Sequence, residues 1–296
     1  MQPDEPIAYI QRTRAYYEGL GYSAPYRWAK FDEVPFSPLA KPLGECKVAL
    51  VTTAVPYRPE FGEQGPGAPY NGSAKFFDVY KSPTAGDPDV RISHIAYDRR
   101  HTSAQDKNTW FPLEELKRAQ ASGRIDAVSE NFFGLPTNRS HNITQTVDCP
   151  RLLELVLADG ADCAIIVPNC PVCHQSAAFA ARHLEVNGIP AVVMGCAKDI
   201  AERAGVARFL FSDFPLGNSA GKPHDLPSQA KTLELALNLL EEAAAPRTTW
   251  NSPIKWSKDS GWKQDYCNIE LLSVDEISRR RAEFDAQKRA AKFEKA

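Results

Sequence analysis

The sequence predicts an α/β fold built on a mainly parallel, doubly wound sheet with helices on both faces. Two observations predict it. Apolar, β-branched segments of strand length alternate with segments of helix length, and several of the helical segments stop at a glycine. Strands that alternate with helices form βαβ units, which place the strands parallel and the helices across the faces of the sheet.

Six segments have the composition of strands. The first, 47–54, is a β-branched run followed by turn residues. The most apolar, 161–167, is continuous in the way of strands that are buried on both faces of a parallel sheet. The other four are 90–97, 124–131, 189–194 and 206–211. We therefore expect a flavodoxin-like or Rossmann-like sheet of about six strands.

Helices are expected between and after these strands, at 111–122, 149–159, 172–187, 198–204 and 229–244. Gly123, Gly160 and Gly188 directly follow three of them, as helix-ending glycines do. The segment 229–244 gathers its leucines and alanines on one face, which is typical of a helix packed on a sheet.

The pattern divides the chain into three parts. Residues 1–45 form an N-terminal extension, 46–245 an α/β catalytic domain, and 246–296 a C-terminal loop and helix. The segment 55–72 is rich in Pro and Gly, and a loop of that length indicates a functional or partner surface. The charged helix expected at 274–295 would pack across the surface or against a second subunit.

Composition excludes several classes of function. The net charge of −2 provides no basic field for nucleic acid, and no apolar stretch is long enough to cross a bilayer. The N-terminus lacks the basic and apolar regions of a secretory signal, so we expect a cytoplasmic protein. Seven cysteines in a reducing compartment do not indicate a disulfide framework.

Two of these cysteines, Cys170 and Cys173, stand where a buried strand turns into a helix. Pro168 and Pro171 end the strand and favour the first helical turn, which places Cys170 near the N-cap. Unpaired N–H groups and the helix dipole lower the pKa of a thiol there. The spacing suits a nucleophile, Cys170, with Cys173 as the resolving thiol, and His174 is a candidate proton carrier.

Three other interpretations of the pair remain open at this point. C-X-X-C-H is also the attachment pattern of haem c, but that attachment occurs on exported chains. Zinc could bind Cys170, Cys173 and His174 with a ligand from a distant loop, although no second ligand pair has suitable spacing. The two cysteines could also only pack. No phosphate-binding loop is present, so we predict no nucleotide cofactor. Because the spacing offers no complete set of ligands, we also predict no metal.

Other polar residues follow predicted strands and are candidates for the same crevice. His101 is a candidate acid or base, and Arg99 and Arg139 are candidate clamps for an anion. Three further residues complete the predicted substrate-binding set: Asp98, Asn108 and Asn169.

Three stretches together resemble the selenoprotein B family of glycine, sarcosine, betaine and D-proline reductases. They are 98–102, 106–125 and 167–175, and the resemblance spans roughly residues 45–245, closest to the D-proline reductase branch. In that family a selenocysteine stands at the position of Cys170, followed by a cysteine that matches Cys173. The resemblance implies reductive cleavage of a small amine, which a pyruvoyl group on a separate subunit activates. Cysteine in place of selenocysteine leaves the reaction itself open.

The sequence thus predicts a cysteine-dependent oxidoreductase that cleaves a C–N or C–S bond of a small molecule. Two alternatives stay open. A non-redox thiol lyase or desulfhydrase would need Cys170 alone, and a non-catalytic subunit would dock a partner enzyme. We expect a homo-oligomer that acts on a small molecule together with a partner subunit or a thiol reductant. We expect no contact with nucleic acid or membrane.

Overall fold

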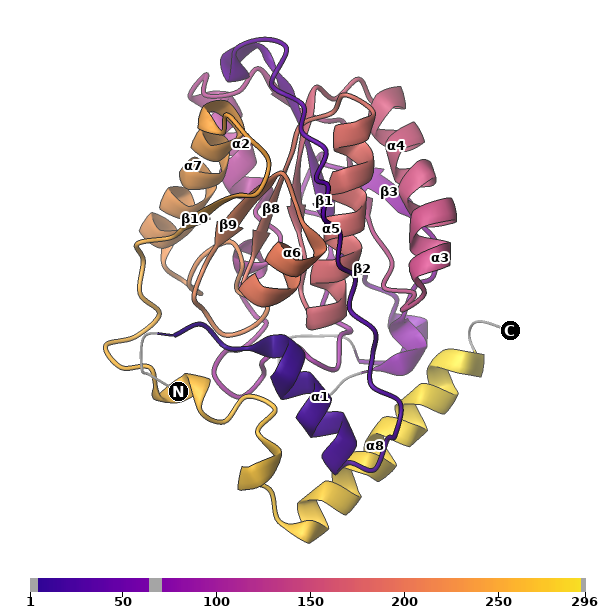
Figure 1. Ribbon diagram of the computed structural model, residues 1–296. Coiled ribbons are helices and arrows are strands. Elements are labelled where there is room, and N and C mark those ends of the chain that lie inside the picture. The colour runs from indigo at the N-terminus through magenta and orange to yellow at the C-terminus, as the bar shows by residue number, and fades with distance from the viewer. Residues whose placement is uncertain (1–4, 64–70, 294–296) are drawn as a thin grey trace.

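The computed structural model describes residues 5–63 and 71–293, and it has three layers with a sheet in the middle (Figure 1). The sheet has eight strands in the order β10-β9-β8-β7-β1-β6-β3, with β5 paired to β1. All pairs but one are parallel, and β3 alone pairs antiparallel, with β6. The predicted α/β class with a mainly parallel, Rossmann-like sheet is confirmed.

The strands are short, and the central ones are fully buried. Their bounds are β1 Lys47–Thr52, β3 Tyr80–Pro83, β5 Ala127–Val128, β6 Asn131–Gly134, β7 Cys163–Val167, β8 Ala191–Gly195, β9 Arg208–Phe211 and β10 Thr248–Asn251. A separate antiparallel pair joins β2, Val55–Pro56, to β4, Val90–Arg91.

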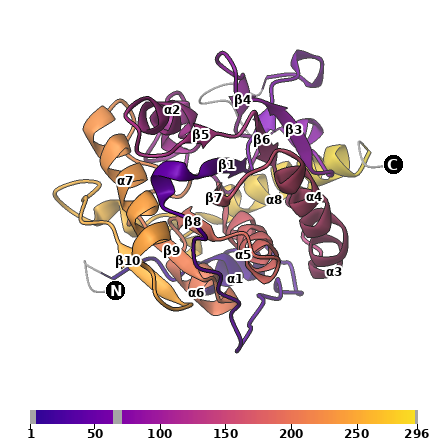
Figure 2. The ribbon, with the colours of Figure 1, turned by 90° about the horizontal axis from the view of Figure 1, so that it is seen from above.

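Helices cover both faces of the sheet (Figure 2). The two faces of β1 show why, since Val48 and Leu50 belong to one apolar core and Ala49 and Val51 to the other. The first core is covered by α2, Leu113–Ala121, and α7, Leu226–Glu242. The second is covered by α4, Cys149–Ala158, α5, Pro171–Val186, and α6, Lys198–Ala204. A strand that is buried on both faces, as β1 is from Val48 to Thr52, requires this double cover.

The order of the strands reverses beside β1. From β1 the chain adds β6 on one side, then crosses back to place β7 on the other side and continues through β8, β9 and β10. Ligands of open α/β sheets bind at such a switch point, beyond the carboxyl ends of the two strands. Here that point lies after Thr52 of β1 and Val167 of β7, which are neighbours in the register.

The terminal extensions lie at this carboxyl edge of the sheet (Figure 1). Helix α1, Tyr9–Gly19, and helix α8, Val274–Phe293, meet there, and the Tyr22 hydroxyl donates to the carboxylate of Asp285 over 2.6 Å. The C-terminal helix therefore packs across the surface of its own chain, one of the two arrangements expected from its charge. None of the described helices is both long and apolar enough to cross a membrane.

Some elements differ from expectation. The strand expected at 90–97 ends at Arg91, because the chain turns at His94, whose carbonyl accepts from the amide of Tyr97. The strand expected at 124–131 is divided between β5 and β6. Strands β3 and β10 were not predicted, and β10 lies beyond residue 245, where we placed the end of the α/β part.

The remaining elements are short. Helix α3, His141–Ile143, continues through a π-helical segment, Thr144–Asp148, directly into α4. The loop expected at 55–72 contains β2 and the 3₁₀ turn Pro59–Phe61, and residues 64–70 of it lie outside the described part. Further 3₁₀ turns are Leu43–Glu45, Gly72–Ala74, Lys107–Thr109, Gly261–Lys263 and Ile269–Leu271.

Candidate active site

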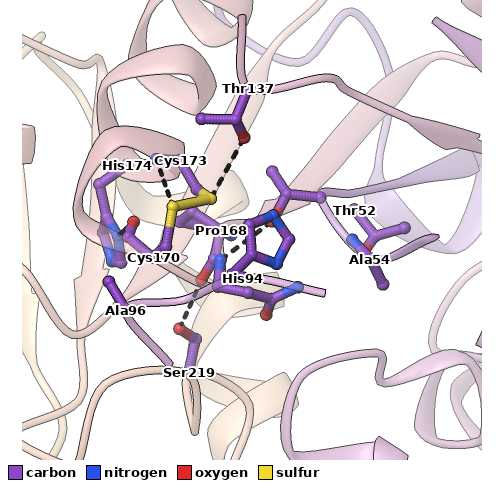
Figure 3. The surroundings of a disulfide bond; sticks show 12 residues. Thr52, Ala54, His94, Ala96, Thr137, Pro168, Cys170, Cys173, His174 and Ser219 are labelled. Atoms are coloured by element: carbon purple, nitrogen blue, oxygen red, sulfur yellow. Dashed lines mark hydrogen bonds between the residues drawn. A yellow bond between two sulfur atoms is a disulfide. The ribbon is translucent and has the colours of Figure 1, made fainter. Parts of the chain in front are cut away.

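The cysteine pair lies at the switch point, where β7 passes into α5. Cys170 is the N-cap of α5, and its Sγ accepts a hydrogen bond from the backbone N–H of Cys173 over 3.1 Å. The two sulfurs form a disulfide, and the Cα atoms are 4.9 Å apart (Figure 3). Cys173 is fully buried, whereas Cys170 keeps 7% of its surface exposed. The pair is therefore asymmetric, with Cys170 toward the outside.

A cavity of about 670 Å³ opens in front of Cys170. Its walls come from α1, the segment 21–28, the loop at 93–96, the loop at 137–139 and α8, so the two terminal extensions enclose it. Aromatic rings from Tyr17, Tyr22, Tyr26, Trp28, Phe76 and Phe284 line it. Among its described lining residues are four cationic side chains, Arg14, Lys75, Arg139 and Lys288, and no carboxylate. The cavity therefore favours an anionic molecule with an apolar part.

His174 is buried directly behind the pair, and both of its ring nitrogens are engaged. Nδ1 lies 2.7 Å from the carbonyl oxygen of Cys170, and Nε2 accepts from the amides of Cys196 and Ala197 over 3.0 and 3.1 Å. These partners require the tautomer with the proton on Nδ1. Burial lowers the pKa of His174 to about 4, so the ring is neutral. His174 fixes the start of α5 to the end of β8.

His94 and Thr137 are two neighbours of the sulfurs that the sequence did not single out. A ring nitrogen of His94 lies within 4.8 Å of both sulfurs, and Thr137 Oγ1 is 3.3 Å from Cys173 Sγ. Burial, together with the charges of Arg99 and Lys75, lowers the pKa of His94 to about 3. His94 opens the polar run after β4, and Thr137 opens the polar run after β6, so each follows a strand end.

The chain is 24% identical over 201 residues to the D-proline reductase subunit gamma of Acetoanaerobium sticklandii, and the alignment covers 67% of this chain and 79% of that protein. It is 22% identical over 240 residues to the glycine reductase complex component B subunit gamma of Peptoclostridium acidaminophilum, and 24% identical over 216 residues to the sarcosine reductase complex component B subunit beta of the same organism. These alignments cover 79% and 72% of this chain.

The chain is similar in sequence to subunits of the D-proline, glycine and sarcosine reductases. The resemblance predicted from the motifs is thus confirmed by sequence similarity to the three kinds of reductase subunit. The chain spans about half the length of the glycine and sarcosine reductase relatives, 54% and 47% respectively. No family model matches it, and no solved structure matches it.

Two of the predicted substrate-binding residues lie beside the cysteines. Arg139 lines the cavity together with Cys170, with its guanidinium 5.6 Å from the centre of the Tyr26 ring. Asn169 is fully buried, and its backbone N–H donates to the Thr53 hydroxyl over 3.0 Å. This hydrogen bond connects the ends of β1 and β7. Neither polar atom of the Asn169 side chain has a hydrogen-bond partner among the described residues.

The other predicted residues do not line this cavity within the described part of the chain. His101 lies between two carboxylates, with Nδ1 2.9 Å from Asp98 and Nε2 3.0 Å from Asp265. Arg99 donates to the carbonyl of His94 over 2.7 Å and so holds the loop that carries this histidine. Asn108 lies in the 3₁₀ turn that precedes α2. The catalytic role of His101 and the substrate-binding roles of Asp98, Arg99 and Asn108 stay predictions.

Proposed function

We propose that the chain is a cysteine-dependent reductase in which Cys170 attacks a small anionic molecule and Cys173 resolves the adduct. The observation that carries the proposal is the asymmetry of the bonded pair. Cys170 reaches the cavity, whereas Cys173 lies behind it within bonding distance. An attacking thiol has to meet the substrate, and a resolving thiol has to meet only the first sulfur.

The reaction has two steps. In the first, the Cys170 thiolate forms a bond to a carbon of the substrate, and the C–N or C–S bond to the leaving group breaks, with the electron pair going to the leaving group. In the second, the Cys173 thiolate attacks Cys170 Sγ, and the S–C bond breaks with its electron pair going to carbon. Protonation gives the reduced product and the free amine or thiol. The dithiol loses two electrons and becomes the disulfide, which an external thiol reductant returns to the dithiol.

Electrostatics of the cavity support an anionic substrate. Lys75, Arg139 and Lys288 line the cavity, and no carboxylate is among its described lining residues. Arg14, which also lines it, is paired with Glu18 over 2.9 Å. A carboxylate on the substrate would bind these cations and would stabilise the carbanion character that develops on an adjacent carbon. Two of the relatives are named for D-proline and sarcosine, and both molecules carry a carboxylate.

His94 is the proton carrier in this proposal, in place of His174. Its Nδ1 is buried without a partner among the described residues, whereas both ring nitrogens of His174 bond to the backbone. Burial, with the charges of Arg99 and Lys75, holds the pKa of His94 at about 3 while the cysteines are bonded to each other. A thiolate beside the ring favours the imidazolium and raises that pKa, which lets His94 take up the thiol proton. His174 has a positioning role, because it orients the carbonyl and the first turn that carry Cys170.

A single-turnover experiment tests the proposal. The full chain is reduced and freed of oxygen and reductant, then mixed with D-proline, glycine or sarcosine, and free thiols are counted. We expect one substrate to consume two thiols per chain and to release one equivalent of product. Cys173→Ser should stop at a covalent adduct on Cys170, which peptide mass spectrometry detects, and Cys170→Ser should form none.

Two outcomes would contradict the proposal in different ways. Repeated turnover by Cys173→Ser would establish the non-redox lyase, since that reaction does not need a resolving thiol. No thiol loss with any of the three, while Cys170 still reacts with alkylating agents, would favour the non-catalytic subunit. The relatives are by name subunits of reductase complexes, so the proposal includes a partner subunit. The single-turnover assay is therefore repeated with any subunit that co-purifies with the chain before a non-catalytic role is concluded.

A further inference from the structure

The two cysteines and His94 together offer three potential metal ligands. Cys170 Sγ, Cys173 Sγ and a ring nitrogen of His94 all lie within 4.8 Å of one another. Figure 3 shows His94 beside the sulfur pair, although it comes from the loop after β4 and the cysteines come from the start of α5. Two thiolates and an imidazole are the ligands that zinc prefers, and catalytic zinc sites use three protein ligands with one open position.

His94 has the features of a ligand rather than of a packed side chain. Its Nδ1 is buried and has no hydrogen-bond partner among the described residues, which costs free energy unless something else binds it. Its loop is held in place, because Arg99 donates to the His94 carbonyl over 2.7 Å. Such support of a ligand's backbone or ring is common around metal sites.

We propose that the dithiol form of the site binds one Zn²⁺ through Cys170, Cys173 and His94, with the fourth position open to the cavity. Zinc–ligand bonds of about 2.0–2.3 Å place the ligand atoms of a tetrahedral site roughly 3.5–3.8 Å apart. The sulfurs separate once the disulfide is reduced, and the ligand spread of 4.8 Å contracts by rotation of side chains. Binding replaces the two thiol protons by one Zn²⁺, so the site gains no net charge.

Zinc and the disulfide exclude each other. Oxidation by hydrogen peroxide takes two electrons from the two thiolates, forms the S–S bond, releases Zn²⁺ and converts one peroxide and two protons into two waters. Zinc would therefore keep the pair reduced but unable to attack a substrate, and oxidation would empty the site. This inference concerns metal binding alone and does not rest on the proposed reductase reaction.

His174 does not belong to this site, although it follows Cys173 in the sequence. Its two nitrogens already bond to Cys170, Cys196 and Ala197, so ligation would require breaking the start of α5. The third ligand, His94, comes instead from a loop 76 residues before Cys170. Motif spacing describes only nearby residues, so it could not predict this ligand.

Cobalt and zinc titrations test the site. The reduced, metal-free full chain is titrated with Co²⁺, and thiolate-to-cobalt charge-transfer absorption is recorded. We expect one Co²⁺ per chain, displacement by Zn²⁺, no binding to the disulfide form, and release of one zinc per peroxide consumed. His94→Ala should weaken binding at least 100-fold, and His94→Cys, which supplies another ligand, should restore it. His183→Ala, on the same helix as the cysteines, should leave binding unchanged.

Failure of the reduced chain to bind Co²⁺ would overturn the inference. Equal affinities of the native chain and a folded His94→Ala would overturn it too, because the cysteines would then use other ligands. Circular dichroism of each variant establishes that it is folded, and His94→Cys decides the matter if His94→Ala does not fold. The single-turnover experiment above is run with chelator present, so either proposal can fail while the other holds.

Discussion

The Nδ1 atom of His174 lies 2.7 Å from the carbonyl oxygen of Cys170, one turn earlier in the same helix. On its other side the ring accepts two amide hydrogens at the end of β8. A single buried ring thus connects the cysteine pair to the neighbouring strand.

His174→Ala should destabilise the protein strongly. The substitution leaves the amides of Cys196 and Ala197 buried without an acceptor and creates a cavity, which together cost about 3 kcal/mol or more. Urea unfolding monitored by circular dichroism measures this. His183→Ala, on the same helix but partly exposed, is the matched control and should cost less than about 1 kcal/mol. Equal losses in the two variants would show that the connection does not stabilise the fold.

The free energy of unfolding should fall in mild acid because the His174 ring is buried in its neutral form. The pKa of His174 is about 4 in the folded chain, whereas the ordinary value of 6.5 applies to the unfolded chain. Between these two pH values, His174 is protonated only in the unfolded chain. Acid therefore favours unfolding, by at most about 1.4 kcal/mol per pH unit from this group. Urea unfolding between pH 7 and pH 4 should give a smaller loss for His174→Gln than for the native chain. A parallel loss in both would assign the acid sensitivity to other groups.

Gly195→Ala should also destabilise, because the ring of His174 occupies the space of a side chain. A Cβ at this position would lie 2.6 Å from His174 Nε2 and 2.9 Å from the Phe209 ring. We expect a cost of about 1–3 kcal/mol from overpacking, measured as a lower thermal midpoint. Gly44→Ala is the control, since its Cβ would meet only the Gly123 carbonyl oxygen at 3.6 Å. A Gly195→Ala variant as stable as the control would refute the tight packing.

Arg139→Ala should reduce the preference of Cys170 for anions. Iodoacetate and iodoacetamide alkylate the same sulfur and differ in charge, so the ratio of their rates reports the potential in the cavity. Loss of one cation should lower that ratio several-fold, by about 1 kcal/mol, and added salt should reduce the difference. Arg151→Ala, exposed on α4, should leave the ratio unchanged. An unchanged ratio in Arg139→Ala would remove this residue from anion recognition.

The sequence predicted the sheet and the place of the cysteine pair because both depend on local patterns. The run 161–167 is apolar throughout, and two prolines flank the N-cap, so strand, turn and helix start could all be predicted. Helix α6 begins and ends at the residues expected. Short strands with weak patterns were missed, such as β3, which is only half-buried and antiparallel.

The rest of the site depends on contacts between distant segments. His94 and Cys170 are neighbours only because the chain turns sharply after β4, and the expected continuation of that strand concealed the turn. His174 follows Cys173 directly, but successive side chains of a helix point in different directions. The His174 ring therefore points away from the cavity and occupies the space beside Gly195 that a side chain would need. The cavity needs both terminal extensions, whose packing has no periodic signal.

The central claim is that Cys170 is the attacking thiol, and site-resolved alkylation tests it most directly. The reduced chain is treated with limiting iodoacetamide across a pH series, and each cysteine is quantified by peptide mass spectrometry. Cys267 also lines the cavity, but burial raises the pKa of its thiol to about 11, so it is an internal reference. We predict that Cys170 reacts fastest, with a midpoint below the free value of about 8.5. Faster reaction at Cys267 or at Cys173 would contradict the account.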